Sequence, residues 1–192
     1  MRRILLTVVV LVCFVAGVSA VSAAGIWVSA KGFKQGVISG GGTGLHAAEF
    51  AALSMDFEVA VPSMGGLVAT GKPLYKPIRL YRALDAASVK LFESMTIGEL
   101  VDPVVISVWG PTPGGTEQIK YQITLGKARV SGIRYLSAYS PGAPSVEFST
   151  VGGIIEEVSL TFDKIEMTHP PTGVTAMDAD VSHPVGARTL AG

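Results

Sequence analysis

The sequence contains little cysteine and little charge, and both shortages exclude protein classes. Its single cysteine, Cys13, lies in an apolar N-terminal run, so the rest of the chain has no disulfide available. The 15 Lys and Arg residues equal the 15 Asp and Glu residues in number, and only 16% of the residues are charged. Because the sequence lacks a basic patch interleaved with aromatic residues, it gives no support to nucleic-acid binding.

Residues grouped as metal ligands are absent from the sequence. His46, His169 and His183 are far apart and lack the spacing of metal-ligating histidines. This pattern is typical of isolated histidines on a surface or in a tail. The sequence therefore predicts no metal site.

Catalytic motifs are missing as well. The sequence contains no G-x-S-x-G elbow, and the glycine run at residues 40–44 lacks the Gly-Lys-Ser/Thr of a phosphate loop. Glu156 and Glu157 are expected on opposite faces of a strand, as solvated or interface carboxylates and not as an acid–base pair. The sequence therefore predicts no catalytic or cofactor-binding residue, and we do not expect an enzyme.

Residues 1–24 have the pattern of a secretory signal peptide. Two arginines precede an apolar run from Ile4 to Val18, and small residues follow that offer cleavage after Ala20 or Ala24. An uncleaved anchor is the alternative, although the run is short for a helix that spans a membrane. Cleavage would leave 13 basic and 15 acidic residues and no cysteine, in a secreted or periplasmic protein.

Most of the remaining chain alternates like strands, in a length sufficient for one core. Strands are predicted at residues 25–31, 50–61 and 77–82, and four more follow residue 103. The alternation changes phase at Gly126 and again at Asp163-Lys164. Two such shifts in long strands indicate bends in a curved, closing sheet.

One helix interrupts the strands, at about residues 85–97. Asp85 suits the N-cap position because its carboxylate can accept the unpaired backbone N–H groups, and Gly98 suits the end. Counted from Ala86, Val89, Phe92 and Thr96 recur at helical spacing with Leu91 and Met95 beside them, which predicts that one face of the helix is buried. The fold class is thus mainly β, with one flanking α-helix.

Three segments have no clear periodicity. Glycine-rich residues 36–44 and residues 63–73 are predicted to be loops. Residues 170–192 begin with Pro-Pro and are predicted to be a disordered C-terminal tail.

The order of several partial motifs resembles that of the Hcp family, the tube proteins of type VI secretion. A Lys-Pro strand leads through an Asp-x-Ala-Ser turn into the single helix, and a late strand ends in a Lys-Ile pair. Coverage is about residues 25–169. The matching residues are Gly71, Lys72, Lys76, Pro77, Ile78, Leu80, Asp85, Ala87, Ser88, Lys90, Leu91, Phe92, Gly98, Val104 and Ile106, then Tyr121, Ile123, Leu125, Val130 and Ser131, and residues 157–166.

The resemblance implies a barrel of two antiparallel sheets with the helix beside it, over residues 25–169. It further implies homo-oligomeric, hexameric rings that stack into a hollow tube, with a contractile sheath, tip proteins and effectors as partners. No catalytic residue carries over from the family. The helix with its neighbouring strands could form part of the ring contact, or it could simply cover the core.

Two departures from the family keep a second function open. Family members generally enter tube assembly from the cytoplasm without a signal peptide, and Val89 replaces the proline that often follows the serine of the turn. Either the N-terminus is a misassigned start and the signal is not used, which leaves assembly in the cytoplasm, or the chain is an exported Hcp-like binding or structural module outside the contractile machine. A periplasmic hydrolase on a β scaffold is a third alternative, which lacks site residues.

Overall fold

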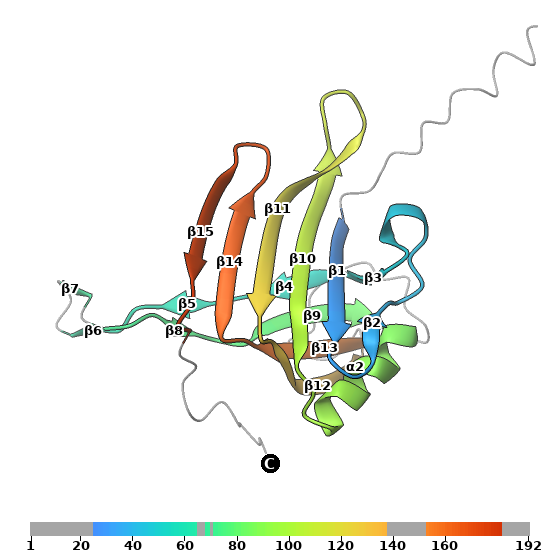
Figure 1. Ribbon diagram of the computed structural model, residues 1–192, viewed down its shortest axis with the longest axis horizontal. Coiled ribbons are helices and arrows are strands. Elements are labelled where there is room, and N and C mark those ends of the chain that lie inside the picture. Colours follow the sequence, from blue (N-terminus) through green and yellow to red (C-terminus); the bar gives the residue numbers. More distant parts are fainter. Residues whose placement is uncertain (1–24, 65–67, 70, 138–152, 182–192) are drawn as a thin grey trace, which may run out of the picture.

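Two antiparallel sheets and one helix form the body of the protein, as predicted. The computed structural model describes residues 25–64, 68–69, 71–137 and 153–181. In Figure 1, the strands of a large sheet stand roughly vertical, alternately pointing up and down, while those of a smaller sheet run across them, with the helix at one end. The predicted signal peptide at residues 1–24 lies outside the described residues.

The larger sheet has seven strands in the order β15-β14-β11-β10-β1-β2, with β3 also paired to β1. The predicted strand at residues 25–31 is confirmed as β1. Gly36–Ile38, placed in a predicted loop, is instead a short strand beside it. The bounds are β1 Gly25–Gly32, β2 Gly36–Ile38, β3 Glu49–Ala52, β10 Val101–Pro111, β11 Glu117–Gly126, β14 Lys164–His169 and β15 Val174–Asp178.

The smaller sheet has four strands in the order β12-β13-β9-β4. The chain passes between the sheets at Leu53, at Lys127 and at Asp163, and the last two positions are the predicted phase shifts. Lys127 adopts a left-handed conformation with φ of 52°. The bounds are β4 Ser54–Asp56, β9 Ile78–Ala83, β12 Arg129–Ser137 and β13 Ile154–Thr161.

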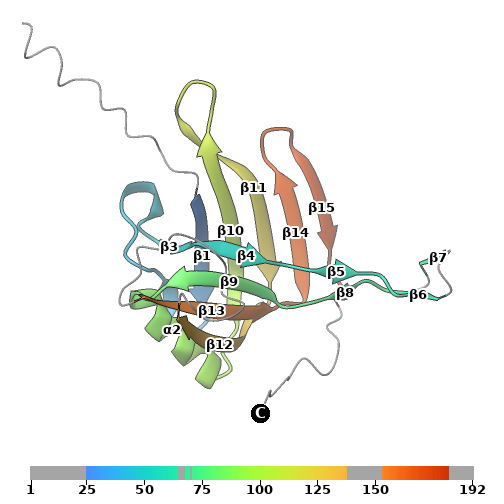
Figure 2. The ribbon, with the colours of Figure 1, turned by 180° about the vertical axis from the view of Figure 1, so that it is seen from behind.

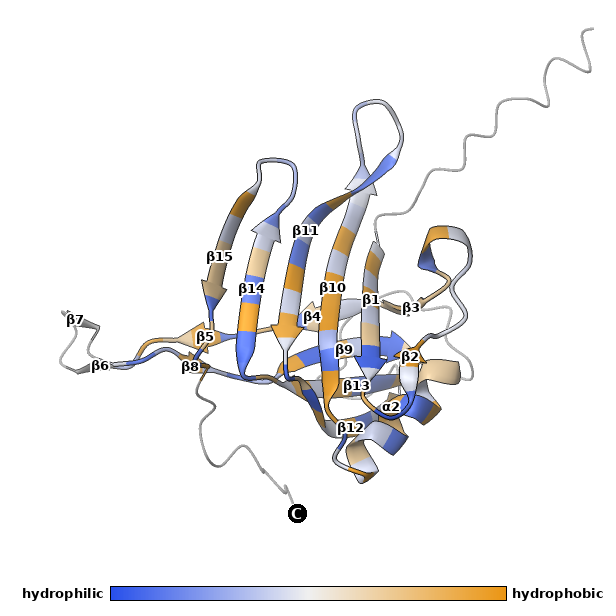
Figure 3. Cartoon of the chain, in the orientation of Figure 1, coloured by the Kyte–Doolittle hydropathy of each residue, from blue (hydrophilic) through white to orange (hydrophobic). Residues whose placement is uncertain are grey.

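The core lies between the two sheets. Ladder partners share a face of their sheet, so Val28, Ile106 and Ile123 form one apolar row across the larger sheet. Leu80 and Val158 face them from the smaller sheet and are also fully buried. Figure 3 shows the resulting alternation along β10 and β11.

Two short ribbons project from the body as an arm. The arm consists of β5 (Val59–Ala60) with β8 (Leu74–Tyr75), and β6 (Ser63–Met64) with β7 (Val68–Ala69). It points away beyond β15, at the end of the molecule opposite the helix (Figures 1 and 2). The predicted loop at residues 63–73 therefore forms most of this arm.

The helix α2, Ala86–Thr96, is where the sequence predicts it, but its buried face is different. Asp85 is the N-cap and Gly98 follows the end with a φ of +65°. The prediction that Val89, Phe92 and Thr96 face the core is wrong, because all three are exposed. The buried residues are Ala87, Ser88, Leu91 and Ser94.

The predicted disordered tail is wrong for its first part. Residues 170–173 form a turn that ends at Gly173 with a φ of +70°, and β15 then pairs with β14. The two prolines therefore belong to a hairpin, in which their fixed φ suits a turn. Residues 182–192 of the predicted tail lie outside the described residues.

Candidate assembly surface

The described residues contain no group of three or more His, Cys, Asp or Glu side chains that could hold a metal ion. His46 and His169 lie on separate elements. The prediction of surface histidines is wrong for His46, which is buried, whereas His169 is exposed. His169 contacts the hydroxyl of Thr172 in the turn before β15, with 2.8 Å between Nδ1 and Oγ1. His183 lies outside the described residues.

His46 joins a loop to the larger sheet. It ends a 3₁₀ helix, η1 (Gly44–His46), and its ring stacks on Trp27 with 4.0 Å between centroids. Trp109 meets the His46 ring edge-on, with 5.1 Å between centroids. The Nδ1 atom of His46 lies 2.6 Å from Glu49 Oε2. A Cβ at Gly42 would lie 2.2 Å from the His46 carbonyl oxygen. Gly42 is therefore closely packed against the residue that carries the His46 ring.

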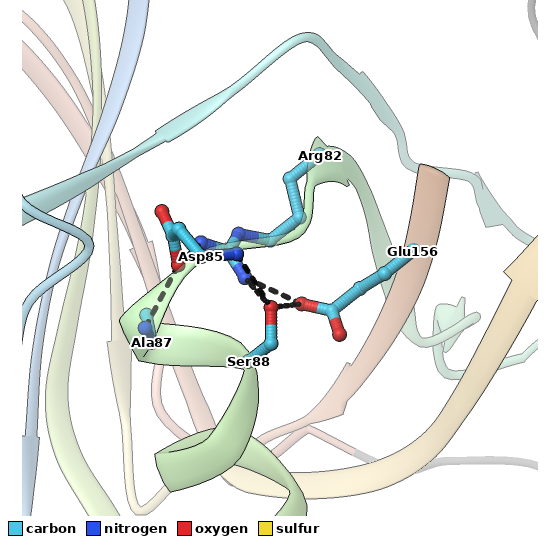
Figure 4. A network of polar contacts seen from close by, with 5 residues as sticks. All are labelled: Arg82, Asp85, Ala87, Ser88 and Glu156. Atoms are coloured by element: carbon cyan, nitrogen blue, oxygen red, sulfur yellow. Dashed lines mark hydrogen bonds and ion pairs between the residues drawn. The ribbon is translucent and has the colours of Figure 1, made fainter. Parts of the chain in front are cut away.

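A buried network fixes the start of the helix (Figure 4). Arg82 on β9 pairs with Glu156 on β13 and with Asp85 before the helix. Ser88 in the first turn receives a hydrogen bond from Arg82 at 2.9 Å and donates one to Glu156 at 3.0 Å. Asp85 also accepts from the Ala87 N–H at 2.8 Å. The first turn of the helix is thus bound to both strands beneath it.

The two central members of this network are fully buried. The side chains of Arg82 and Glu156 are 0% exposed, so no substrate reaches them. The prediction that Glu156 and Glu157 are solvated is therefore wrong, although they do lie on opposite faces. Glu157 is also buried and pairs with Arg134 at 2.6 Å between Nη2 and Oε2.

A second carboxylate fixes the end of the helix. Glu99 accepts hydrogen bonds from the backbone N–H groups of Lys34 and Gln35, and from the side chains of Gln35 and Ser94. Burial alone would raise the pKa of Glu99, but these hydrogen bonds outweigh burial and lower that pKa. The helix and the turn between β1 and β2 are therefore joined as one unit.

Exposed apolar side chains occur on both parts of this unit, the turn and the helix. Phe33 in the turn is 86% exposed and Val89 on the helix is 71% exposed. We call these residues the helix-end surface, and we define it as Phe33, Val37, Val89, Phe92 and Ile97, all of which are exposed. Exposed apolar side chains that gather in this way are typical of an interaction site.

A groove lies at the opposite end of the molecule, between the arm and the outer strands of the larger sheet. It encloses about 510 Å³, which is within the range of binding pockets in proteins. We call it the arm-end groove; its lining residues are Phe57, Val59, Tyr75, Ile165, Met167, Ala176, Met177 and Asp178. It continues the apolar row of the core past the edge of the smaller sheet.

One hydrogen bond ties the arm to the groove. The Tyr75 hydroxyl on β8 donates to Asp178 on β15, with 2.7 Å between the oxygens. Burial and then this bond raise the pKa of Tyr75 to about 12, while the same bond lowers the pKa of Asp178. This hydrogen bond therefore fixes the arm, on one side of the groove, against β15 on the other side.

Sequence reasoning found the helix of this surface but neither the groove nor the two networks. Val89 and Phe92 are exposed although their helical spacing predicts burial, and the buried Ser88 and Ser94 give no apolar signal in the sequence. Among the described residues, no helix has the length and apolarity required to cross a membrane.

Comparison with known proteins gives one family and several structural relatives. Residues 34–169 match the family model described as "Type VI secretion system effector, Hcp". A curated relative, the "Major exported protein" of Pseudomonas aeruginosa, is 29% identical over 111 residues. That match covers 57% of this chain and 61% of the relative, so the chain spans about three fifths of the relative's length.

Solved structures share the fold at low identity. A crystal structure of an Hcp protein has a TM-score of 0.72 at 19% identity, covering 83% of this chain and 99% of that one. The secreted protein Hcp3 from Pseudomonas aeruginosa has a TM-score of 0.66 at 22% identity, covering 83% of this chain and 100% of that one.

Glu156→Gln should destabilise the protein strongly, because it leaves the buried Arg82 without its main counter-charge. We expect the free energy of unfolding to fall by roughly 3–5 kcal/mol, measured by urea denaturation. Glu157→Gln is the matched control, since its partners Arg79 and Arg134 are 46% and 60% exposed, and it should cost about 1 kcal/mol. Equal losses in the two variants would contradict the anchoring role of Glu156.

Glu99→Gln should remove a pH-dependent part of the stability. Because folding lowers the pKa of Glu99 from its ordinary value of 4.5, the charged form stabilises the native state above that value. This contribution disappears as the pH falls through the lowered pKa of the native state. The difference in unfolding free energy between wild type and variant should therefore be largest near pH 6 and shrink toward pH 3.

The exposed Glu93→Gln serves as the control for loss of a carboxylate near the end of the helix. A difference between wild type and Glu99→Gln that stays constant from pH 6 to pH 3 would argue against the assigned role of Glu99.

Proposed function

Because the chain belongs to the Hcp family of type VI secretion proteins, we propose that its copies assemble head to tail into a closed ring of six. The rings stack into a tube, and the protein acts as a structural subunit with no catalytic role. The observation that carries this proposal is the placement of two apolar surfaces at opposite ends of one molecule. Contacts between different surfaces generate rings when the rotation closes.

The exposed side of the helix supports a place in the ring contact. Leu91 packs into the core, whereas Val89 and Phe92 point away from it. The helix therefore covers the core with one face and presents apolar side chains on another. Burying these side chains against a neighbour would remove them from water, which favours association.

Within a tube, the expected partners are other copies of this chain, the sheath and tip proteins of the machine, and effectors in the lumen. The family model carries the word effector in its own description. Export is in keeping with the name of the curated relative.

The sequence of residues 1–24 favours a second candidate function. A protein exported through its own signal peptide does not meet a sheath in the cytoplasm, and would act outside as an Hcp-like binding or structural module. Both candidates use the same ring contact, so their difference lies in the route of export.

Native mass tests the ring, and Val89→Asp tests the contact. We expect light scattering on the purified full chain to give a mass near six protomers. Val89→Asp should release folded monomers, because a charge replaces an exposed apolar side chain in the contact. A wild-type monomer would contradict the ring, and loss of folded protein in Val89→Asp would contradict the exposed position of Val89.

Leu45→Asp is the matched control for Val89→Asp. Leu45 is 80% exposed and lies outside both apolar surfaces, so this variant should keep the wild-type mass. Circular dichroism should show the same folded state in both variants, since exposed substitutions usually change stability by about 0.5 kcal/mol or less.

Deleting residues 2–24 separates the two routes of export. If these residues are a signal peptide, the shortened chain should remain in the cytoplasm, as fractionation and immunoblotting would show. The full chain should then reach the periplasm or medium in cells that lack the contractile sheath. Export of the shortened chain that depends on the sheath would instead support the tube and contradict the signal peptide.

A further inference from the structure

We propose that Phe33 of each protomer inserts into the arm-end groove of the next protomer, as the central contact of the ring. This inference rests on the proposed function and adds the residues that make the contact. Three observations support it: Phe33 is an exposed aromatic side chain, the groove is apolar, and the two lie at opposite ends of the folded molecule.

The turn that carries Phe33 is held in place from behind. The Phe33 N–H donates to the Leu100 carbonyl at 3.0 Å, and Glu99 receives the next two backbone N–H groups. Gly36 closes the turn with a φ of +71°. Because the backbone is already ordered, binding through Phe33 costs little conformational entropy. Exposed aromatic residues of this kind are enriched at the centres of interfaces.

The groove suits an aromatic ring in size and lining. Met167 and Ala176 are ladder partners on its floor, and Val59 and Met177 lie at its exposed rim. Methionine side chains adapt their shape and make favourable contacts with aromatic rings. The groove exists because the larger sheet extends beyond the strands that cover its inner face.

Charge and position both favour a second copy of this chain as the occupant. The exposed Lys31 and Lys34 flank Phe33. Asp178 lines the groove and accepts from Tyr75, and Asp180 follows it and pairs with the exposed Lys72. Opposite charges at the two surfaces favour correct pairing of neighbours. Phe33 lies in the turn between β1 and β2, at the helix end, while the groove lies at the arm end (Figures 1 and 2). A chain therefore cannot fill its own groove.

Disulfide cross-linking between two different variants tests this contact. In full chains that carry Cys13→Ser, Phe33→Cys and Ala176→Cys proteins are mixed and exposed to mild oxidant. We expect a disulfide-linked dimer that contains one chain of each kind, since a disulfide forms only when the two Cα atoms are within about 7 Å. A double variant should give a ladder that ends at six chains.

Thr175→Cys is the matched control, because Thr175 is adjacent to Ala176 on the same strand but does not line the groove. Its mixture with Phe33→Cys should give no heterologous dimer. Equal cross-linking of the two mixtures would overturn the contact.

Light scattering on the same samples separates the two proposals. A mass near six protomers without the Phe33–Ala176 cross-link would overturn this contact and leave the ring standing. Monomers throughout would overturn the ring and the contact together. Phe33→Asp should raise the protein concentration needed for assembly by about tenfold or more, as expected of a central interface residue. An unchanged concentration would also overturn the contact.

Discussion

The buried ion pair between Arg82 and Glu156 is the interaction on which the arrangement of the helix depends. Removing two charges from water is costly, and the pair is tolerated because Ser88, Asp85 and the ring of Phe50 surround the guanidinium. The network binds the first turn of the helix to two strands at once. It thereby sets which face of α2 looks inward and which side chains remain for a partner.

The unequal widths of the two sheets have a second consequence for assembly. A chain without a disulfide in its described part depends on buried apolar surface, yet the seven-stranded sheet extends past the four-stranded one. The uncovered inner face of β14 and β15 becomes a groove, which the arm borders but does not fill. Surface left open in the monomer is in this way available to an oligomer.

Local sequence signals predicted most of the fold, whereas long-range pairing remained hidden. Asp85 and Gly98 marked the helix ends through their own backbone chemistry, and the phase shifts marked two passages between sheets. The buried face of the helix was missed because Ser88 and Ser94 face polar networks, which reverses the usual apolar pattern. The partner of Glu156 lies 74 residues away, and β15 became recognisable only through its ladder with β14.

Both tryptophans of the chain contact the same imidazole. Trp27 and Trp109 lie on neighbouring strands, and His46 reaches them from the glycine-rich segment that packs over the sheet. The intrinsic emission of the protein is therefore a local signal, which reports how that segment sits on the sheet. It follows the seating of one loop, while events at the helix and the arm require a different optical probe.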